Sequence, residues 1–206
     1  MNEILPGIFH WVTVHDHINM PVSSYYLDGP KGAALIDPRV PDEGLEWFAG
    51  RNRPEHIFLT NRHHYRHSDR FVGALARQVW CHRNGLHEFT HGEEVTGFGA
   101  GSPLPAGLEV VEIGSICPDE TALYIPWARA VSFADGLVRA DFDGPLGFVP
   151  DFLMGDDPEA VKRGLRAAFG RLLERDFDHL LLAHGAPWIG GGHEALRTFI
   201  GSQPEG

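Results

Sequence analysis

Four short apolar runs in this chain each end in a polar segment that can ionise. In chain order these segments are Asp37, the His/Arg cluster at residues 62–67, Asp135 and His184. Apolar runs of this length, bounded by polar residues, are typical of buried strands. Loops that leave the ends of buried strands hold functional groups on a rigid scaffold. We therefore expect the four segments to converge at one edge of a sheet structure.

The pattern along the whole chain places strands first, with helices interspersed, and then further strands and helices. The clearest helix is predicted at 158–174, because Asp157 is a good N-cap and Pro158 suits the first helical position. Asp42 is expected to cap a short helix, and residues 97–107 are expected to be loop. This order is satisfied by two mixed sheets between outer helices. Strands are expected at 8–14, 24–27, 33–36, 57–59, 79–81, 108–113, 121–125, 130–134 and 180–183.

Length and charge limit the classes of protein that this chain can belong to. A chain of 206 residues is predicted to form one domain over 1–206. The net charge of −11 argues against nucleic acid and against an anionic membrane surface, since phosphates bind clustered Lys and Arg. No apolar run approaches the length of a bilayer span. Two cysteines, Cys81 and Cys117, and no visible secretory signal lead us to expect a cytoplasmic location.

The polar strand ends, taken in order, resemble the motifs of the metallo-β-lactamase superfamily. Members show a strand ending in Leu-Ile-Asp-Pro, then Leu-Thr-His-x-His-x-Asp-His, Gly-His-Thr-Pro-Gly-Ser, Gly-Asp and a final Gly-His-Gly. The similarity extends from residue 5 to the C-terminal helix, and it implies an α+β fold, an αββα four-layer sandwich with its site along one edge of the two sheets. The matching segments are residues 35–38, 59–67, 114–121, 133–135 and 183–185.

The loop motif departs from the pattern of the family. With one residue inserted after Thr60, the cluster retains two of the four loop ligands, His64 and His67. Arginine stands at the other two positions, Arg62 in place of the first histidine and Arg66 in place of the aspartate. The resemblance therefore implies a degenerate metal site in which both losses within the loop are to a cation.

Two points of this mapping stay open. Without the inserted residue, the cluster keeps only His63. In the middle motif Ile116 falls at the usual histidine position, and a slip of one residue makes Cys117 a thiolate ligand. Asp135, the usual bridging carboxylate, and His184, a usual ligand of the second site, are retained.

The remaining ligands predict one divalent cation or none. The first of the two family sites keeps His64 and a share of Asp135, so we expect it to be empty. The second keeps His67, His184 and Asp135, which are enough for one ion, zinc above all, with an open position. A guanidinium at about 4 Å repels such an ion by several kcal/mol at an effective dielectric of about 20. A mononuclear site therefore requires Arg66 to turn away.

Three alternatives remain open at this point. The first is a metal-dependent hydrolase of a small ester, thioester, lactone or amide, with His64 and Asp135 as candidate catalytic residues. The second is an inactive relative that binds an anionic ligand or a protein partner through Arg62 and Arg66. A third is a fold kept only for oligomer contacts. A small-molecule substrate or an anionic ligand is the expected partner, with no nucleic acid and no membrane, and the oligomeric state stays open.

Overall fold

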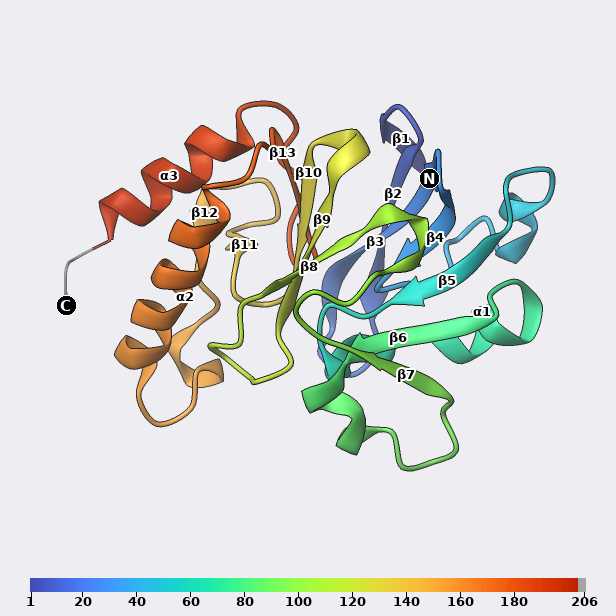
Figure 1. Cartoon of the computed structure of the whole chain (residues 1–206), viewed down its shortest axis with the longest axis horizontal. Helices are drawn as coiled ribbons and strands as arrows, with labels where there is room; N and C mark the ends of the chain where they lie inside the picture. The colour runs from blue at the N-terminus through green and yellow to red at the C-terminus, as the bar shows by residue number, and fades with distance from the viewer. Residues whose placement is uncertain (204–206) are drawn as a thin grey trace.

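Two β-sheets lie face to face at the centre of the protein, and helices cover their outer faces (Figure 1). The structure is a computed structural model that describes residues 1–203. The first sheet has seven strands in the order β1 to β7, and the second has four in the order β13-β10-β9-β8. Both sheets contain parallel and antiparallel pairs. The α+β sandwich of two mixed sheets between outer helices is thereby confirmed.

The first sheet begins as an antiparallel meander and continues as a parallel sheet. Neighbours from β1 to β4 pair antiparallel, and neighbours from β4 to β7 pair parallel. Its strands are β1 (Asn2–Leu5), β2 (Ile8–His15), β3 (Met20–Gly29), β4 (Gly32–Ile36), β5 (Pro54–Phe58), β6 (Gln78–His82) and β7 (Val95–Phe98).

The second sheet contains one parallel pair of strands and two antiparallel pairs. Strand β10 pairs parallel with β13 and antiparallel with β9, which pairs antiparallel with β8. A separate two-stranded ribbon is formed by β11 and β12. The strands are β8 (Glu109–Glu112), β9 (Thr121–Ile125), β10 (Ala130–Phe133), β11 (Val138–Arg139), β12 (Leu146–Gly147) and β13 (His179–Leu182).

Three α-helices complete the sandwich. Helix α2 begins as predicted, because the Asp157 side chain accepts a hydrogen bond from the Ala160 backbone N–H at 2.9 Å and Pro158 occupies the first turn. Among the described residues, no helix combines the length and apolarity needed to cross a membrane. The helices are α1 (Ser68–Ala74), α2 (Pro158–Leu172) and α3 (Gly192–Ser202), and the 3₁₀ turns used below are η1 (Leu45–Phe48), η2 (Arg62–Tyr65) and η3 (Arg83–Glu88).

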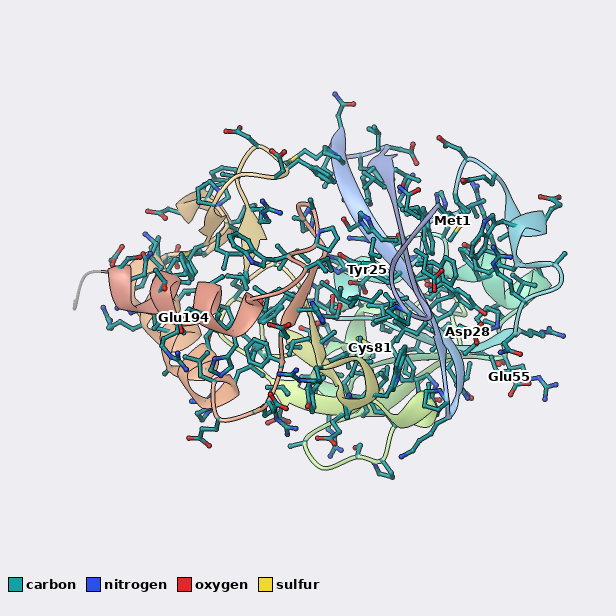
Figure 2. The ribbon with its side chains drawn as sticks, turned by 90° about the horizontal axis from the view of Figure 1, so that it is seen from above. Met1, Tyr25, Asp28, Glu55, Cys81 and Glu194 are labelled. Carbon is teal, nitrogen blue, oxygen red and sulfur yellow. The ribbon has the colours of Figure 1, made fainter. Side chains whose placement is uncertain are left out.

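Apolar side chains fill three layers that correspond to the spaces between the four structural layers. Phe71 of α1 packs on the outer face of the first sheet, and Phe169 of α2 packs on the outer face of the second. Between the sheets, Phe58 faces Leu123 and Leu181. Tyr25 also lies in this middle layer, near the centre of the molecule in Figure 2, and its hydroxyl donates to a backbone carbonyl of the opposite sheet at 2.8 Å.

Two local predictions are wrong. The segment after Asp42 is the 3₁₀ turn η1 rather than an α-helix, and its N-cap is Gly44 with no side-chain cap. Gly44 has φ 75 and ψ −177, which separates Asp42 from the turn. Residues 97–98, expected in a loop, belong to edge strand β7, which pairs only with β6 and whose short sequence Val-Thr-Gly-Phe carries little apolar pattern.

The two sheets come closest at the edge where β4, β5, β10 and β13 reach their carboxyl ends. Two backbone hydrogen bonds join the sheets at this edge. The Ser23 N–H donates to the Ala183 carbonyl at 2.9 Å, and the Thr121 N–H donates to the Thr60 carbonyl at 2.9 Å. The predicted polar strand ends therefore lie on both sides of one seam.

Candidate metal centre

Three of the predicted side chains converge at this seam. His64 comes from η2, Asp135 follows β10 and His184 follows β13. The Oδ1 atom of Asp135 lies 3.2 Å from His64 Nε2 and 3.0 Å from His184 Nε2. One ligand atom from each residue falls within 4.8 Å of the others. In the part of the chain that the structure describes, no other three His, Cys, Asp or Glu side chains converge this closely.

His64 is held with one ring nitrogen facing Asp135. Its Nδ1 lies 2.9 Å from Asp37 Oδ2 and 2.9 Å from the Thr60 hydroxyl. The Thr60 hydroxyl donates its proton to Asp37 Oδ2 at 2.5 Å, so it can only accept from the histidine. We therefore assign the proton to Nδ1, which directs Nε2 toward Asp135. A carboxylate behind a histidine is the arrangement that orients histidines bound to metals.

Asp135 is oriented by Asn61, which sequence reasoning did not find. The Asn61 amide donates to Asp135 Oδ2 at 2.7 Å, and its own oxygen accepts from the His63 backbone N–H at 2.9 Å. The second oxygen, Oδ1, is buried and has no hydrogen bond of good geometry within residues 1–203. A buried carboxylate oxygen without a well-aligned donor is costly. This atom, lying between two imidazoles, therefore has the environment of a ligand atom.

The group balances its own charge when no ion is bound. Burial favours the neutral form of His64, but the charges of Asp37 and Asp135 outweigh it and raise the His64 pKa to about 9. Burial also raises the pKa of Asp135, but the charge of His64 and the close approach of His184 hold it well below its ordinary value. His64 is thus protonated near neutral pH, and a metal ion has to displace that proton.

Arg66 lies beside these ligands in a strained backbone conformation. Its Nη1 donates to the Ser23 carbonyl at 2.7 Å and to the Asp37 carbonyl at 2.8 Å. Its Nη2 is buried without a partner among the described residues. Arg66 has φ 47 and ψ −114, and Asp37 has φ 46, conformations that cost about 1–3 kcal/mol each in a non-glycine residue. Burial lowers the pKa of Arg66, whereas the charges of Asp37 and Asp135 raise it.

Two predicted loop residues do not reach the centre, and these expectations are corrected here. His67 is the N-cap residue directly before α1, and its Nδ1 accepts a hydrogen bond from the Val40 backbone N–H at 3.1 Å. The positive φ of Arg66 reverses the chain between His64 and His67, so their rings project to different places. Arg62 is paired with the fully buried carboxylate of Asp119, to which both its backbone N–H and its guanidinium donate.

The middle motif supplies structural carboxylates instead of a metal ligand. Cys117 is absent from the converging group, and burial raises the pKa of its thiol to about 12. Glu120 accepts from the Gly136 N–H at 2.6 Å and from the Ile116 N–H at 3.2 Å. Burial, with the charge of Asp135, raises the Glu120 pKa to about 7. Glu120 therefore holds the loop that begins with Asp135.

The residues missed by sequence reasoning left weak signals. Asn61 takes the place of the first histidine in the register without an insertion, and Thr60 is the last residue of its apolar run. Asp119 and Glu120 are adjacent carboxylates directly before buried strand β9. Charged residues so close to a buried strand require partners, but a sequence does not show which ones.

Comparisons with known proteins decide the fold. No protein-family model matches the sequence, and a comparison with curated proteins finds no significant match. Solved structures do match. A metallo-beta-lactamase family protein from Thermus thermophilus is 18% identical over 97% of this chain and 80% of its own, with a TM-score of 0.68. The chain has the metallo-β-lactamase fold.

Other structures with the metallo-β-lactamase fold are similarly distant in sequence. A metallo-beta-lactamase from Pontibacter korlensis is 16% identical over 98% of both chains, with a TM-score of 0.67. A protein solved in a di-iron-bound form is 22% identical over 90% of this chain and 96% of its own, with a TM-score of 0.65. The metallo-β-lactamase resemblance inferred from the motifs is confirmed for the fold. Identities this low carry no substrate over to this chain.

Proposed function

We propose that the protein is a metal-dependent hydrolase that binds one divalent cation, with zinc the first choice. The ligands are His64 Nε2, Asp135 Oδ1 and His184 Nε2. The observation that supports this is the buried Asp135 Oδ1, which has no well-aligned hydrogen-bond donor and lies 3.0–3.2 Å from the two imidazole nitrogens. Three protein ligands with an open fourth position are typical of catalytic zinc.

The surrounding residues fit one such ion. Asp37 orients His64, and Asn61 orients Asp135, so two of the three ligands have a supporting partner. The two negative charges of Asp37 and Asp135 exceed the single positive charge of Arg66, so the centre is negative once His64 loses its proton. Arg66 Nη1 is held by two backbone carbonyls, although the charge of the guanidinium still acts on His64 and Asp135.

A second ion does not fit. Its family ligands would come from positions that Arg62 and Arg66 occupy, and Arg62 is already paired with Asp119. The alternative function, an inactive relative that binds an anion through both arginines, loses Arg62 for the same reason.

The open side of the centre indicates how a substrate reaches it. The side chains of Asp135 and His184 are 27% and 21% exposed, whereas that of His64 is 6% exposed. A divalent cation there would polarise a carbonyl oxygen and lower the pKa of a bound water, the chemistry needed to hydrolyse a small ester, thioester, lactone or amide. Asp37 and Asn61 fix the ligand geometry from behind, and the scissile bond approaches from the Asp135 and His184 side.

The test combines metal analysis with hydrolysis. Untagged protein, loaded with zinc, manganese or iron and desalted, is expected to hold about one ion per chain. Asp135→Asn and His184→Gln are expected to lose it, and the exposed-histidine control His87→Gln is expected to keep it. Hydrolysis of an ester, thioester and lactone panel should follow the metal content and stop with a chelator. Ion binding that persists in both ligand variants, or the absence of chelator-sensitive hydrolysis, contradicts the proposal.

A further inference from the structure

Four cationic or protonatable side chains gather beside the metal centre, although the chain carries a net charge of −11. We call Arg39, Arg66, His15 and His67 the cation cluster. The loop at residues 37–40 includes Arg39 and contacts two other members of the cluster. The Asp37 carbonyl accepts a hydrogen bond from Arg66, and the Val40 backbone N–H donates one to His67. Burial and then the charges of Arg39 and Arg66 lower the pKa of His15, as expected when these groups are neighbours.

The arginines of the cluster have unused donors. Arg39 is 5% exposed and its Nε is buried without a partner in the described chain, as is Nη2 of Arg66. A buried guanidinium N–H that makes no hydrogen bond is costly, so each is a place where an added acceptor would be stabilising. Oxyanions suit such places, because a carboxylate or phosphate can accept two guanidinium hydrogen bonds at once.

One acid of the protein occupies the edge of the cluster. Asp16, at the tip of the β2–β3 hairpin, accepts from Arg39 Nη2 at 2.8 Å, and its side chain is 74% exposed. The hydrogen bond and the charge of Arg39 hold the pKa of Asp16 below its usual value, with smaller contributions from His67 and His15. Asp16 therefore contacts Arg39 from the solvent side, and its charge also acts on His67 and His15.

We propose that the cation cluster binds a carboxylate or phosphate group of the substrate, and that Asp16 occupies this place in the free protein. The incoming oxyanion replaces the Asp16 carboxylate on Arg39 and also accepts hydrogen bonds from the unused donors, Arg39 Nε and Arg66 Nη2. Arg66 belongs both to the cluster and to the surroundings of His64, so the anion lies next to the metal centre. This inference rests on the proposed function, because it makes the substrate of the hydrolase a small anionic molecule.

The first experiment measures anion binding without catalysis. Metal-free protein is titrated with inorganic phosphate, and binding is followed by calorimetry and by the rise in melting temperature. Asp16→Asn is expected to bind phosphate about threefold to fivefold more tightly, because it removes the exposed carboxylate that competes with phosphate for Arg39. Arg39→Gln is expected to lose binding. The control Asp176→Asn removes an exposed acid from Arg129 elsewhere and should change nothing.

The second experiment measures substrate preference. Initial rates are compared for p-nitrophenyl acetate and for the anionic mono-p-nitrophenyl succinate, with metal supplied. Arg39→Gln is expected to raise KM for the anionic ester at least about tenfold more than KM for the neutral ester, a difference of about 1.4 kcal/mol. Asp16→Asn should lower KM for the anionic ester and serves if Arg39→Gln does not fold.

The outcomes separate the two proposals. Metal-dependent hydrolysis with equal preference for both esters, together with unchanged phosphate binding in Asp16→Asn, overturns the anion site and leaves the hydrolase intact. Phosphate binding that strengthens in Asp16→Asn, in a protein that neither holds metal nor hydrolyses any ester, supports the anion site and rejects the hydrolase.

Discussion

Arg62 and Arg66 belong to one loop, yet their charges are met in opposite ways. Arg62 donates to Asp119, an acid with no exposed surface, and its Nε lies 3.7 Å from Glu88. Arg66 makes no ion pair and donates instead to two backbone carbonyls, with one nitrogen left over among the described residues. Both arginines occupy positions where the family places metal ligands. One of them is built into the scaffold, and the other keeps a positive charge beside the site.

The two arginines illustrate two ways in which a fold can accommodate a largely buried cation. A buried cation with a buried acid partner contributes to packing and is closed to ligands. A buried cation that is held only by backbone carbonyls has no acid partner to neutralise its charge. That charge can therefore balance nearby carboxylates or an incoming anion. The predictions below test this contrast, beginning with the largest expected effect.

Removing the Arg62 charge should strongly destabilise the fold. Arg62→Met leaves the carboxylate of Asp119 buried and unpaired, which is expected to cost about 3–5 kcal/mol in urea denaturation. The double variant R62M/D119L should recover most of the loss, because it removes both charges. Equal stability of the single and double variants would show that the pair is not what holds this half of the loop.

Acid should act on the Arg66 side through His10. This buried histidine contacts the Ser23 hydroxyl at 2.9 Å, and burial lowers its pKa to about 4. Below about pH 6.5 His10 is protonated in the unfolded chain but stays neutral in the folded chain. The free energy of unfolding therefore falls as the pH drops from about 6.5 to 4, by about 3 kcal/mol in all. Denaturation curves of His10→Gln should lack this part of the acid sensitivity, and curves that parallel the wild type contradict it.

Replacing Arg66 should cost less than replacing Arg62 and should favour the metal. Arg66→Met leaves two carbonyls without a donor but orphans no directly bonded acid, so we expect a loss of about 1–3 kcal/mol. Removal of the cation should tighten zinc at least about tenfold, because like charges no longer repel. Competition with a chelating dye measures this affinity, and weaker zinc binding would mean that Arg66 supports the ligands.

Replacing Asn61 should weaken metal binding. Asn61→Ala removes the donor that orients Asp135, and supporting residues of this kind change metal affinity by about tenfold or more. The same dye competition applies, with the exposed Asn84→Ala as the matched control. Zinc affinity that is equal in both variants would exclude a role for Asn61 in orienting the ligand.

The sequence predicted the parts of this site that follow from strand ends. Asp135 and His184 come directly after neighbouring parallel strands, so their convergence required only that two apolar runs be recognised as strands. The same holds for Asp37 after β4. The metallo-β-lactamase fold followed from the order of these segments, which is a property of the whole chain and does not depend on any one motif.

The loop between β5 and α1 could not be predicted in the same way. Its geometry depends on a 3₁₀ turn and on the positive φ of Arg66, and no local pattern indicates a left-handed arginine. That single torsion moves His67 away and leaves Asn61 against Asp135. The partner of Arg62 was also hidden, because Asp119 lies 57 residues away and nothing near either residue names the other.

The location of the candidate metal site at the seam between the two sheets has a second consequence. His64 follows β5 of the first sheet, whereas Asp135 and His184 follow β10 and β13 of the second, so an ion held by the three residues would link the two sheets. Such an ion would bind only the folded chain, and its contribution to the free energy of unfolding would grow with the logarithm of the free metal concentration. The amide hydrogens of β5 and β10 should then exchange with solvent more slowly when metal is present, and the two strands should slow together. The cellular metal supply would in that case regulate the lifetime of the protein as well as its chemistry.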